Sequence, residues 1–477
     1  MTKVLSKKDQ ERRELILNGN MWRVILYIAT PLAVFQWLQQ FFRIFDTVIA
    51  AQISPMSVSA VAYLSQISGI ISALGAGISV GSCIKIGEAY GAGEYETVHK
   101  MVNSLMKVCG QVSFVVLICI PFSSSFLKVL GTPDDFILEG TIYFAIILLD
   151  CAINFYNTSY IAIERIRGHS GLIFGLNLSA FFVKLGLSML FVFVFNGGVH
   201  MIALATVISD MVIFTAFVIN LCIKDKDGIF AVKMIRVRHD KNIFKSMANM
   251  STPVIIEKVL FQYGKYLMTV MASGYGSLVS GALGISNNIG GMTVSLSGGF
   301  QDAGSAIISQ NVGAGKKRRS LDAFYKLCVI NTLIGVIGFI LASTFMAEIA
   351  SIFDGGDPEF SQLIQDIYFW EVYALVPQAF FGAVCALLYG NGYTRMSMVL
   401  NLVRLFVLRV PVLWLFQAFT DVGYQATGIA MCTSNGGIGI IGGIASIFVV
   451  RRIKKDIAIE EAMEKEEQLE ILEEENE

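Results

Sequence analysis

The chain has 477 residues, of which 55% are hydrophobic and 15% are charged, and its mean hydropathy is +0.64. This composition is typical of a protein that lies mostly in lipid, and a formal net charge of −1 argues against a nucleic-acid partner. The eight cysteines lie in or beside apolar segments without paired extracellular spacing, so we expect reduced packing residues. The polar first twenty residues lack the apolar core of a secretory signal.

Twelve segments are long and apolar enough, or nearly so, to cross a bilayer as helices, which takes about 20 residues. They are expected at 22–52, 58–88, 101–127, 137–163, 171–195, 200–223, 247–273, 281–310, 321–346, 361–389, 396–418 and 424–450. Pro31, Pro377 and Pro411 fall inside these ranges and are expected to bend the helices. The sequence thus predicts an all-α membrane protein with six transmembrane helices in each half.

Lys and Arg gather in alternate connections between these segments. They occupy the N-terminal arm and the stretches 165–167, 224–245, 316–319 and 451–455, whereas the other connections carry Lys128 as their clear cation. Because cytoplasmic loops are enriched in Lys and Arg, we expect a multi-pass protein of the cell membrane with both termini in the cytoplasm.

The two halves of the chain repeat each other. The following positions coincide without a gap: Pro31 with Pro253, Gly69 with Gly291, Gly77 with Gly299, and the Gly-Ala-Gly motif at 91–93 with the one at 313–315. Two bundles related by an axis along the membrane normal characterise one large group of secondary transporters, which bind substrate between the halves. The repeat predicts pseudo-twofold symmetry and favours transport.

The expected organisation has four parts. They are an N-lobe over 1–223, a cytoplasmic linker over 224–246, a C-lobe over 247–452 and an acidic cytoplasmic tail over 453–477. Loose helical spacing of apolar residues predicts an amphipathic helix in the tail. The glycine-rich stretch 313–317 lacks the arrangement that wraps phosphates in ATPases. Transport energy is therefore expected from an ion gradient or from the gradient of the substrate itself.

With these features the chain resembles the multidrug and toxin extrusion (MATE) family over nearly its full length. The stretches that carry the resemblance are 45–47, 91–93, 199–206, 253–257, 310–316 and 390–394. The resemblance implies a central cleft between two lobes, and export of organic cations or amphipathic drugs by alternating access, coupled to inward flow of Na+ or H+. We expect small-molecule substrates and membrane lipids as partners, no organic cofactor, no enzymatic activity and a monomer.

Ionisable residues inside a bilayer are costly and are functional candidates. Asp46 matches the helix 1 carboxylate of the family and can bind H+ or Na+, or can instead pair with Arg43 on the same helix face. The family also uses a Thr on helix 6, which matches Thr206, and an Asn and an Asp on helix 5, which are replaced here by Lys184 and Ser188. We expect Lys184 to approach Asp46 as a built-in counter-ion.

Two amides on the fourth segment, Asn154 and Asn157, are expected either to join this N-lobe polar site or to pack between helices. In the second half, Glu257 matches the helix 7 acid of the family and Glu371 resembles its C-lobe partner. Glu371 can instead be a residue of the outer leaflet. Two carboxylates in a low dielectric can form a proton or Na+ site, so we expect coupling to have moved to the C-lobe.

Lysine and arginine residues inside the spans leave the substrate open. Lys265, Arg404 and Arg409 are expected to be counter-ions of the acids. The same residues, with Lys184 and Lys258, can also form a basic cleft for a diphosphate, which favours a flippase for lipid-linked oligosaccharides or peptidoglycan precursors. A membrane-embedded lipid transferase is a third hypothesis, which the missing catalytic constellation disfavours.

Overall fold

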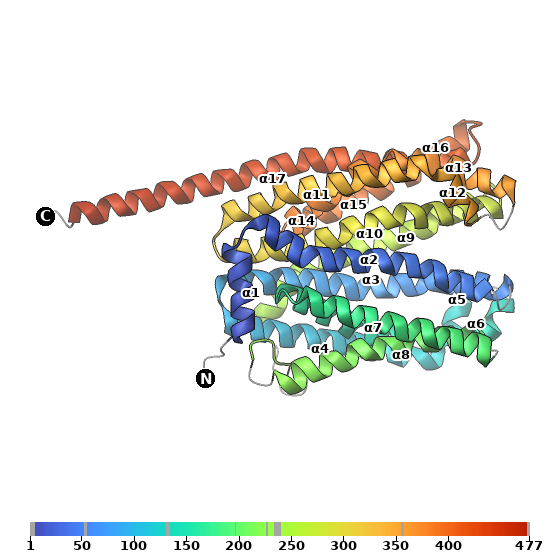
Figure 1. The fold of residues 1–477 in the computed structure, drawn as a ribbon, viewed down its shortest axis with the longest axis horizontal. Helices are drawn as coiled ribbons and strands as arrows, with labels where there is room; N and C mark the ends of the chain where they lie inside the picture. The colour runs from blue at the N-terminus through green and yellow to red at the C-terminus, as the bar shows by residue number, and fades with distance from the viewer. Residues whose placement is uncertain are drawn as a thin grey trace.

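The computed structural model describes residues 5–51, 55–129, 134–195, 197–225, 228–232, 240–353 and 357–474. Within these ranges, the backbone alone is described for residues 41–51, 55–66, 129, 134–139, 199, 277, 464, 467 and 469–474. The elements in these ranges are all helices (Figure 1). The first half contains α1 (Lys7–Asn18), α2 (Met21–Ala51), α3 (Pro55–Ala92), α4 (Tyr95–Cys119), η1 (Ile120–Phe122), α5 (Ser123–Val129), α6 (Asp134–Ile166), α7 (Ser170–Met189), η2 (Leu190–Val194), α8 (Val199–Phe217) and η3 (Val218–Lys224). The second half contains α9 (Lys241–Ser273), α10 (Ser277–Gly313), α11 (Lys317–Thr344), α12 (Met346–Ser351), α13 (Pro358–Val372), α14 (Leu375–Gly390), α15 (Thr394–Phe406), α16 (Val410–Phe419) and α17 (Gln425–Glu474).

Twelve of these helical stretches form the membrane bundle, and the predicted fold class is confirmed. Nine stretches of described residues are long and apolar enough to span a membrane, and α13 with α14, bent by 51°, counts as a tenth. The remaining two are α9 and α10, which have 33 and 37 residues. Both carry polar residues that line the cleft described below, and this lowers their hydropathy.

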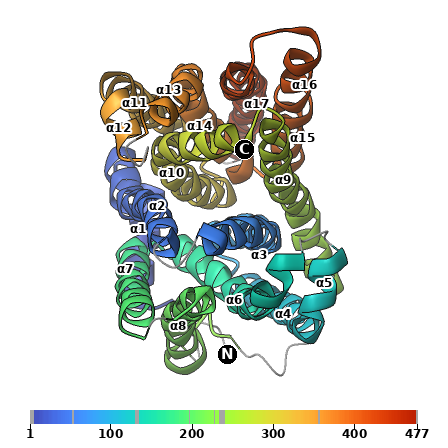
Figure 2. The ribbon, with the colours of Figure 1, turned by 90° about the vertical axis from the view of Figure 1, so that its right-hand side faces the viewer.

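The two halves pack against each other through α3 and α9 and through α2 and α10. Viewed from the end of the bundle, the helices of the two halves form separate groups. Helices α2 and α3 of the first group face α9 and α10 of the second (Figure 2). The arrangement is that of two lobes facing each other across a shared axis.

Small residues bring the lobes into direct backbone contact, and the contacts are reciprocal. A Cβ atom at Gly77 would lie 2.6 Å from the Cα atom of Ile255, and one at Gly299 would lie 2.3 Å from the Cα atom of Ala33. The sequence repeat superposes Gly77 on Gly299 and Ala33 on Ile255. Glycine therefore permits the same close crossing twice, as pseudo-twofold symmetry requires.

A second reciprocal pair lies at the Gly-Ala-Gly turns. A Cβ atom at Gly91 would lie 2.0 Å from the carbonyl oxygen of Gln310, and one at Gly313 would lie 1.9 Å from that of Glu88. Glu88 and Gln310 are again equivalent in the repeat. The backbones of the two lobes are thus in direct contact near the end of the bundle where α1 lies, which we call the α1 end.

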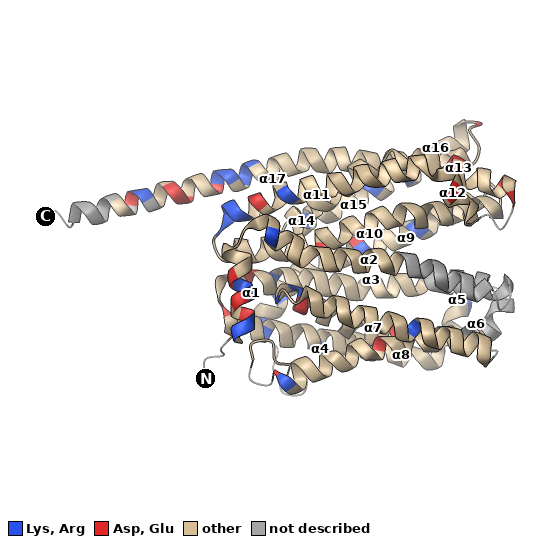
Figure 3. Ribbon diagram, viewed as in Figure 1, with Lys and Arg blue, Asp and Glu red and all other residues tan. Residues whose placement is uncertain are grey.

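Helix α1 joins both lobes at this end, although its polar sequence was expected only to form an arm. Arg13 donates from Nε and Nη2 to the carbonyl oxygens of Tyr90 (3.1 Å) and Gly91 (2.7 Å) in the first lobe. From the second lobe, Arg319 Nη2 donates to the carbonyl oxygen of Ile16 at 3.1 Å. Many of the Lys and Arg residues lie in helix segments at the α1 end (Figure 3).

Four helix boundaries differ from the prediction for identifiable reasons. Pro377 and Pro411 lie in the first turns of α14 and α16 rather than inside continuous helices, because proline lacks the N–H group that would bond to the preceding turn. The end of the expected linker is helical, since Asp240 caps α9 by accepting hydrogen bonds from the backbone of Asn242 and Ile243. The tail continues α17 without a break, and the ion pairs Lys317–Glu460 and Arg318–Glu461 hold its first turns to α11.

A buried charge cluster fixes α1 to the first lobe. Asp9, only 3% exposed, lies 2.8 Å from Arg167 Nη2 and 3.1 Å from His169 Nε2. Burial disfavours the ionised form of Asp9, but hydrogen bonds from His169 and Arg167 prevail and hold its pKa well below the usual range. Burial likewise disfavours protonated His169, yet its bonds to Asp9 and Glu164 prevail and raise the pKa of His169 above the ordinary value of 6.5.

This cluster predicts that the docking of α1 depends on pH. Because the pKa of folded His169 is raised, its stabilising effect is fully present below the unfolded value of about 6.5 and is lost as the pH rises through the folded value. We expect α1 amides, corrected for intrinsic exchange, to lose protection from hydrogen exchange on alkaline titration. His169→Gln should remove that titration step; an unchanged step in the variant would contradict the assignment.

Candidate functional site

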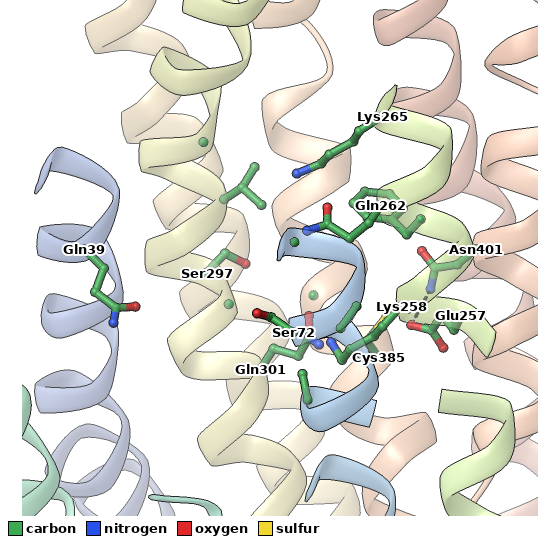
Figure 4. Close-up of a pocket in the computed structure, with 18 of the residues that line it drawn as sticks. Gln39, Ser72, Glu257, Lys258, Gln262, Lys265, Ser297, Gln301, Cys385 and Asn401 are labelled. Atoms are coloured by element: carbon green, nitrogen blue, oxygen red, sulfur yellow. Dashed lines mark hydrogen bonds between the residues drawn. The ribbon is translucent and has the colours of Figure 1, made fainter. Parts of the chain in front are cut away.

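A cleft of about 820 Å³ lies between the lobes, lined by residues of both halves (Figure 4). Its apolar lining includes Ile213, Phe261, Val294 and Phe381. Its polar lining comes from helices of both lobes, and Lys258 and Lys265 project from α9 into it (Figure 4). The cleft therefore offers both apolar surface and concentrated charge.

Glu257 lies in the wall of the cleft where α9 meets α14 and α15. Its side chain is 7% exposed, and its Oε1 accepts hydrogen bonds from Tyr389 Oη at 2.5 Å and Asn401 Nδ2 at 3.0 Å. Its Oε2 has no hydrogen-bond partner among the described residues. One oxygen is thus held by two donors, while the other lies buried without a hydrogen bond to the described residues.

Glu371, on α13, occupies a different part of the same lining. It is 4% exposed, and its Oε2 accepts a hydrogen bond from Ser286 Oγ of α10 at 2.7 Å. Among the described residues, no hydrogen bond joins it to Glu257, and the two acids have different partner helices. Both face the cleft, but each has its own polar environment.

Arg404 and Arg409 lie side by side in the second-lobe wall. Both side chains are buried and both bond to one atom, Asn435 Oδ1, at 2.5 Å from each Nη2. Arg409 Nε also donates to Ser434 Oγ at 2.9 Å. Arg409 falls in the break between α15 and α16 that precedes Pro411. The broken helix therefore places two guanidinium groups at one point of the cleft.

In the first lobe, a polar cluster forms around Asp210 of α8. Asn154 Nδ2 lies 3.4 Å from Asp210 Oδ2, and Asn157 Nδ2 donates to the Asp210 carbonyl oxygen at 2.9 Å. Asp150 of α6 lies within hydrogen-bonding reach of the Asp210 carboxyl group, and the Lys184 ammonium interacts electrostatically with both acids. The two amides and Lys184 are thus brought together, around acids that sequence reasoning had not selected.

The missed acids carried a usable signal. Asp150 and Asp210 both fall inside predicted spans, at 137–163 and 200–223, so the rule that selected Asp46 applies equally to them. The stretches that carry the resemblance to the MATE family do not include either acid, so the resemblance does not indicate them.

The other predicted site residues are placed as follows. Thr206 Oγ1 donates to the Ile202 carbonyl oxygen at 3.2 Å, and Ser188 Oγ is buried without a partner among the described residues. Neither is part of the described cleft lining. Asp46 and Arg43 lie outside the residues whose side chains are described, so the expected contact between Asp46 and Lys184 stays a prediction.

The cleft is electrically uneven. The second-lobe wall carries four cations, Lys258, Lys265, Arg404 and Arg409, against the two acids Glu257 and Glu371. The first-lobe wall contributes Asp210. The counter-ion role expected for the arginines is not met by direct pairing, because no described ion pair within 4.0 Å joins either guanidinium to a carboxylate.

A charged cleft between two repeated membrane bundles defines a transporter rather than an enzyme. The sequence matches the MatE family over residues 31–190 and 253–415, one stretch in each half, and the chain belongs to this family. The predicted family membership is therefore confirmed.

Similar proteins agree with this assignment. The chain is 23% identical to "Probable multidrug resistance protein YoeA" of Bacillus subtilis, over 70% of this chain and 74% of that protein. Two solved structures share its fold with a TM-score of 0.86 at 18% identity, covering 95% of this chain and all of theirs. One is described as an outward-facing multidrug resistance MATE transporter of the MOP superfamily. The other is a MOP superfamily transporter from Pyrococcus furiosus whose reversed pocket polarity is said to suggest a different function.

The cluster in the first lobe predicts strong coupling between Lys184 and Asp210. Lys184→Met should lower the free energy of unfolding in mixed micelles, because two neighbouring carboxyl groups lose their cation. With Asp210→Asn also present, much of that loss should be recovered, giving a coupling energy of about 2 kcal/mol. The exposed pair Lys100 and Glu96 is the control and should show no measurable coupling. Additive effects at Lys184 and Asp210 would contradict the interaction.

Proposed function

We propose that the protein is a secondary active exporter of amphipathic molecules, which works by alternating access and is driven by inward flow of H+ or Na+. The observation that carries the proposal is the position of the cleft, which lies between the two repeats and is lined by buried carboxyl groups from the membrane helices. Binding sites at such repeat interfaces are typical of secondary transporters. The multidrug-resistance names of related proteins support a drug-like substrate.

Glu257 is proposed as the principal coupling residue, with Glu371 as a second site. A coupling carboxylate must exchange its ion during the transport cycle, so it needs contact with the cleft and an oxygen that the protein does not saturate. Glu257 meets both conditions, since it lines the cleft and its Oε2 has no described partner. Glu371 also lines the cleft, but its Oε2 already accepts a bond from Ser286. Oxygen ligands of this kind suit either a proton or Na+.

A flippase for lipid-linked diphosphates is the second candidate. The four cations of the second-lobe wall favour it. The reversed pocket polarity described for the Pyrococcus furiosus transporter of similar fold, which is said to suggest a different function, supports considering it. Drug-driven release of H+ or Na+ from vesicles supports the exporter, whereas movement of a lipid-linked precursor between leaflets without a drug response supports the flippase.

The exporter is proposed to act in the cell membrane as a monomer with both termini in the cytoplasm. The basic residues at the α1 end support this orientation (Figure 3). The Asp150–Asp210 pair and Asp46 remain further candidates for ion binding in the first lobe.

Replacing Glu257 by Gln should abolish efflux driven by an ion gradient while leaving measurable substrate affinity. The substitution keeps the shape of the side chain and its bonds to Tyr389 and Asn401, but it removes the charge that must bind and release the ion. Efflux from proteoliposomes under separate pH and Na+ gradients is the measurement, with exposed Glu348→Gln as a control. Asp46→Asn should be milder. Normal pumping by Glu257→Gln would shift the assignment to the first lobe.

The proposed orientation predicts that two introduced cysteines react with a maleimide from opposite sides of the membrane. Glu359→Cys, at the start of α13, should react with an impermeant maleimide added to intact cells, whereas Lys465→Cys, in the α17 tail, should react only after permeabilisation. Accessible native cysteines are first replaced by serine. Reaction of both positions from the same side would refute the proposed topology.

A further inference from the structure

Two buried arginines of the cleft wall share a single acceptor. Arg404 and Arg409 are 7% and 2% exposed, and both contact Asn435 Oδ1. Like charges held at one neutral oxygen repel each other, and an amide oxygen neutralises neither. Their position in the membrane-spanning part of the protein makes this repulsion costly, since water there is scarce.

The nearby acids do not form ion pairs with these arginines. Among the described residues, neither guanidinium lies within 4.0 Å of a carboxylate oxygen, since Glu257 bonds to Tyr389 and Asn401 and Glu371 bonds to Ser286. The acids act on the arginines only at longer range. Buried charges without a close partner are strongly unfavourable unless a ligand or water completes the site.

The unused donor groups of the two arginines indicate where a ligand would bind. Arg404 uses Nε and Nη2, and Arg409 uses Nε and Nη2, so the Nη1 group of each has no described partner. Both residues line the cleft. Paired N–H groups of two guanidiniums match the geometry of a carboxylate or phosphate.

The surroundings of the arginine pair suit an amphipathic molecule with an anionic group. The ring of Phe261 lies 5.1 Å from Arg404, 5.9 Å from Arg409 and 5.3 Å from Lys265 Nζ, each distance measured to the ring centroid. Three cations therefore surround one aromatic side chain of the lining. Apolar surface for the remainder of the molecule continues along Val294, Phe381 and Met431.

We propose that the second-lobe wall of the cleft is a binding subsite for an anionic group, a carboxylate or a phosphate, carried by an amphipathic molecule and held between Arg404, Arg409 and Lys265. The proposal rests on the proposed transport function in one respect, because the molecule bound at this subsite is taken to be the molecule transported. It narrows the substrate class from amphipathic molecules in general to amphipathic anions and zwitterions.

The test compares two probes that share a ring and differ in charge, 1-naphthyl phosphate and 1-naphthylmethylammonium. Their affinities for the purified protein in nanodiscs of phosphatidylcholine are measured at equilibrium, without an ion gradient, so the result does not depend on whether transport occurs. The parent protein should bind the phosphate at least about tenfold more tightly. Arg404→Gln should weaken phosphate binding about tenfold or more and leave ammonium binding unchanged or improved.

Two further variants keep the test decisive. Arg395→Gln removes an exposed cation from the same helix, α15, and should leave both affinities unchanged. If Arg404→Gln does not fold, Arg409→Lys retains the charge but loses the planar pair of donors, and it should weaken phosphate binding while the ammonium affinity stays constant. Equal or tighter binding of the ammonium probe by the parent, or unchanged phosphate binding in a folded arginine variant, would overturn the proposal.

A second experiment distinguishes a lipid headgroup from a soluble anion as the occupant of the subsite. Nanodiscs with about a third of anionic phosphatidylglycerol present lipid phosphate at high local concentration. If a lipid headgroup occupies the subsite, naphthyl phosphate affinity should fall in these nanodiscs for the parent protein and not for Arg404→Gln. If the subsite takes soluble anions only, the parent affinity should be the same in both membranes. Each result supports an anion subsite and identifies its natural occupant.

Discussion

The close approach of the two repeats is the constraint on which the rest of the structure depends. At Gly77 and Gly299, and again at Gly91 and Gly313, backbone atoms of one lobe occupy the space that a side chain would need in the other. In a membrane, helices gain little from hydrophobic burial against each other, so such contacts rely on small residues and tight packing. The first pair of crossings fixes α3 against α9 and α2 against α10, and the second fixes α3 against α10. All four helices line the cleft. A side chain at any of these glycines would separate the lobes where they are now joined.

Charge placement follows from this arrangement. Helices that face lipid remain apolar, as α11 does, whereas α9 carries Glu257, Lys258 and Lys265 because that face meets the cleft. Breaks in the helices also place charged residues at the cleft. Proline at 377 and 411 removes backbone donors where α13 gives way to α14 and α15 to α16, and the charged residues Glu371 and Arg409 stand beside these breaks. The ionisable groups of the second-lobe membrane helices thus collect along the cleft rather than on the lipid-facing surface, as the energetics of charges in lipid require.

The sequence predicted the architecture better than the site. The repeat and the twelve apolar segments were visible because they depend on spacing and composition, and the reciprocal glycine contacts involve positions that the repeat had already paired. The helical nature of residues 7–18 was not visible, since α1 gains its stability from Asp9, Arg13 and their distant partners rather than from an apolar face. The pairing of Asp150 with Asp210 also depends on how α6 and α8 pack, which local sequence does not specify. Glu257 could be selected, but its bonds to Tyr389 and Asn401 connect three helices and become evident only in the folded chain.

The uninterrupted course of α17 has a mechanical consequence. Its 50 residues extend over about 75 Å at 1.5 Å per residue, and its C-terminal part projects from the bundle (Figure 1). Ion pairs to α11 tie the base of this projection to the second lobe, so the projecting helix is a lever arm rigidly attached to that lobe. For the roughly 20 Å of helix beyond these ion pairs, a tilt of about ten degrees displaces the tip by about 3.5 Å. Small rotations of the lobe inside the membrane are thereby converted into larger movements in the aqueous phase, where a spectroscopic probe or another molecule can follow them.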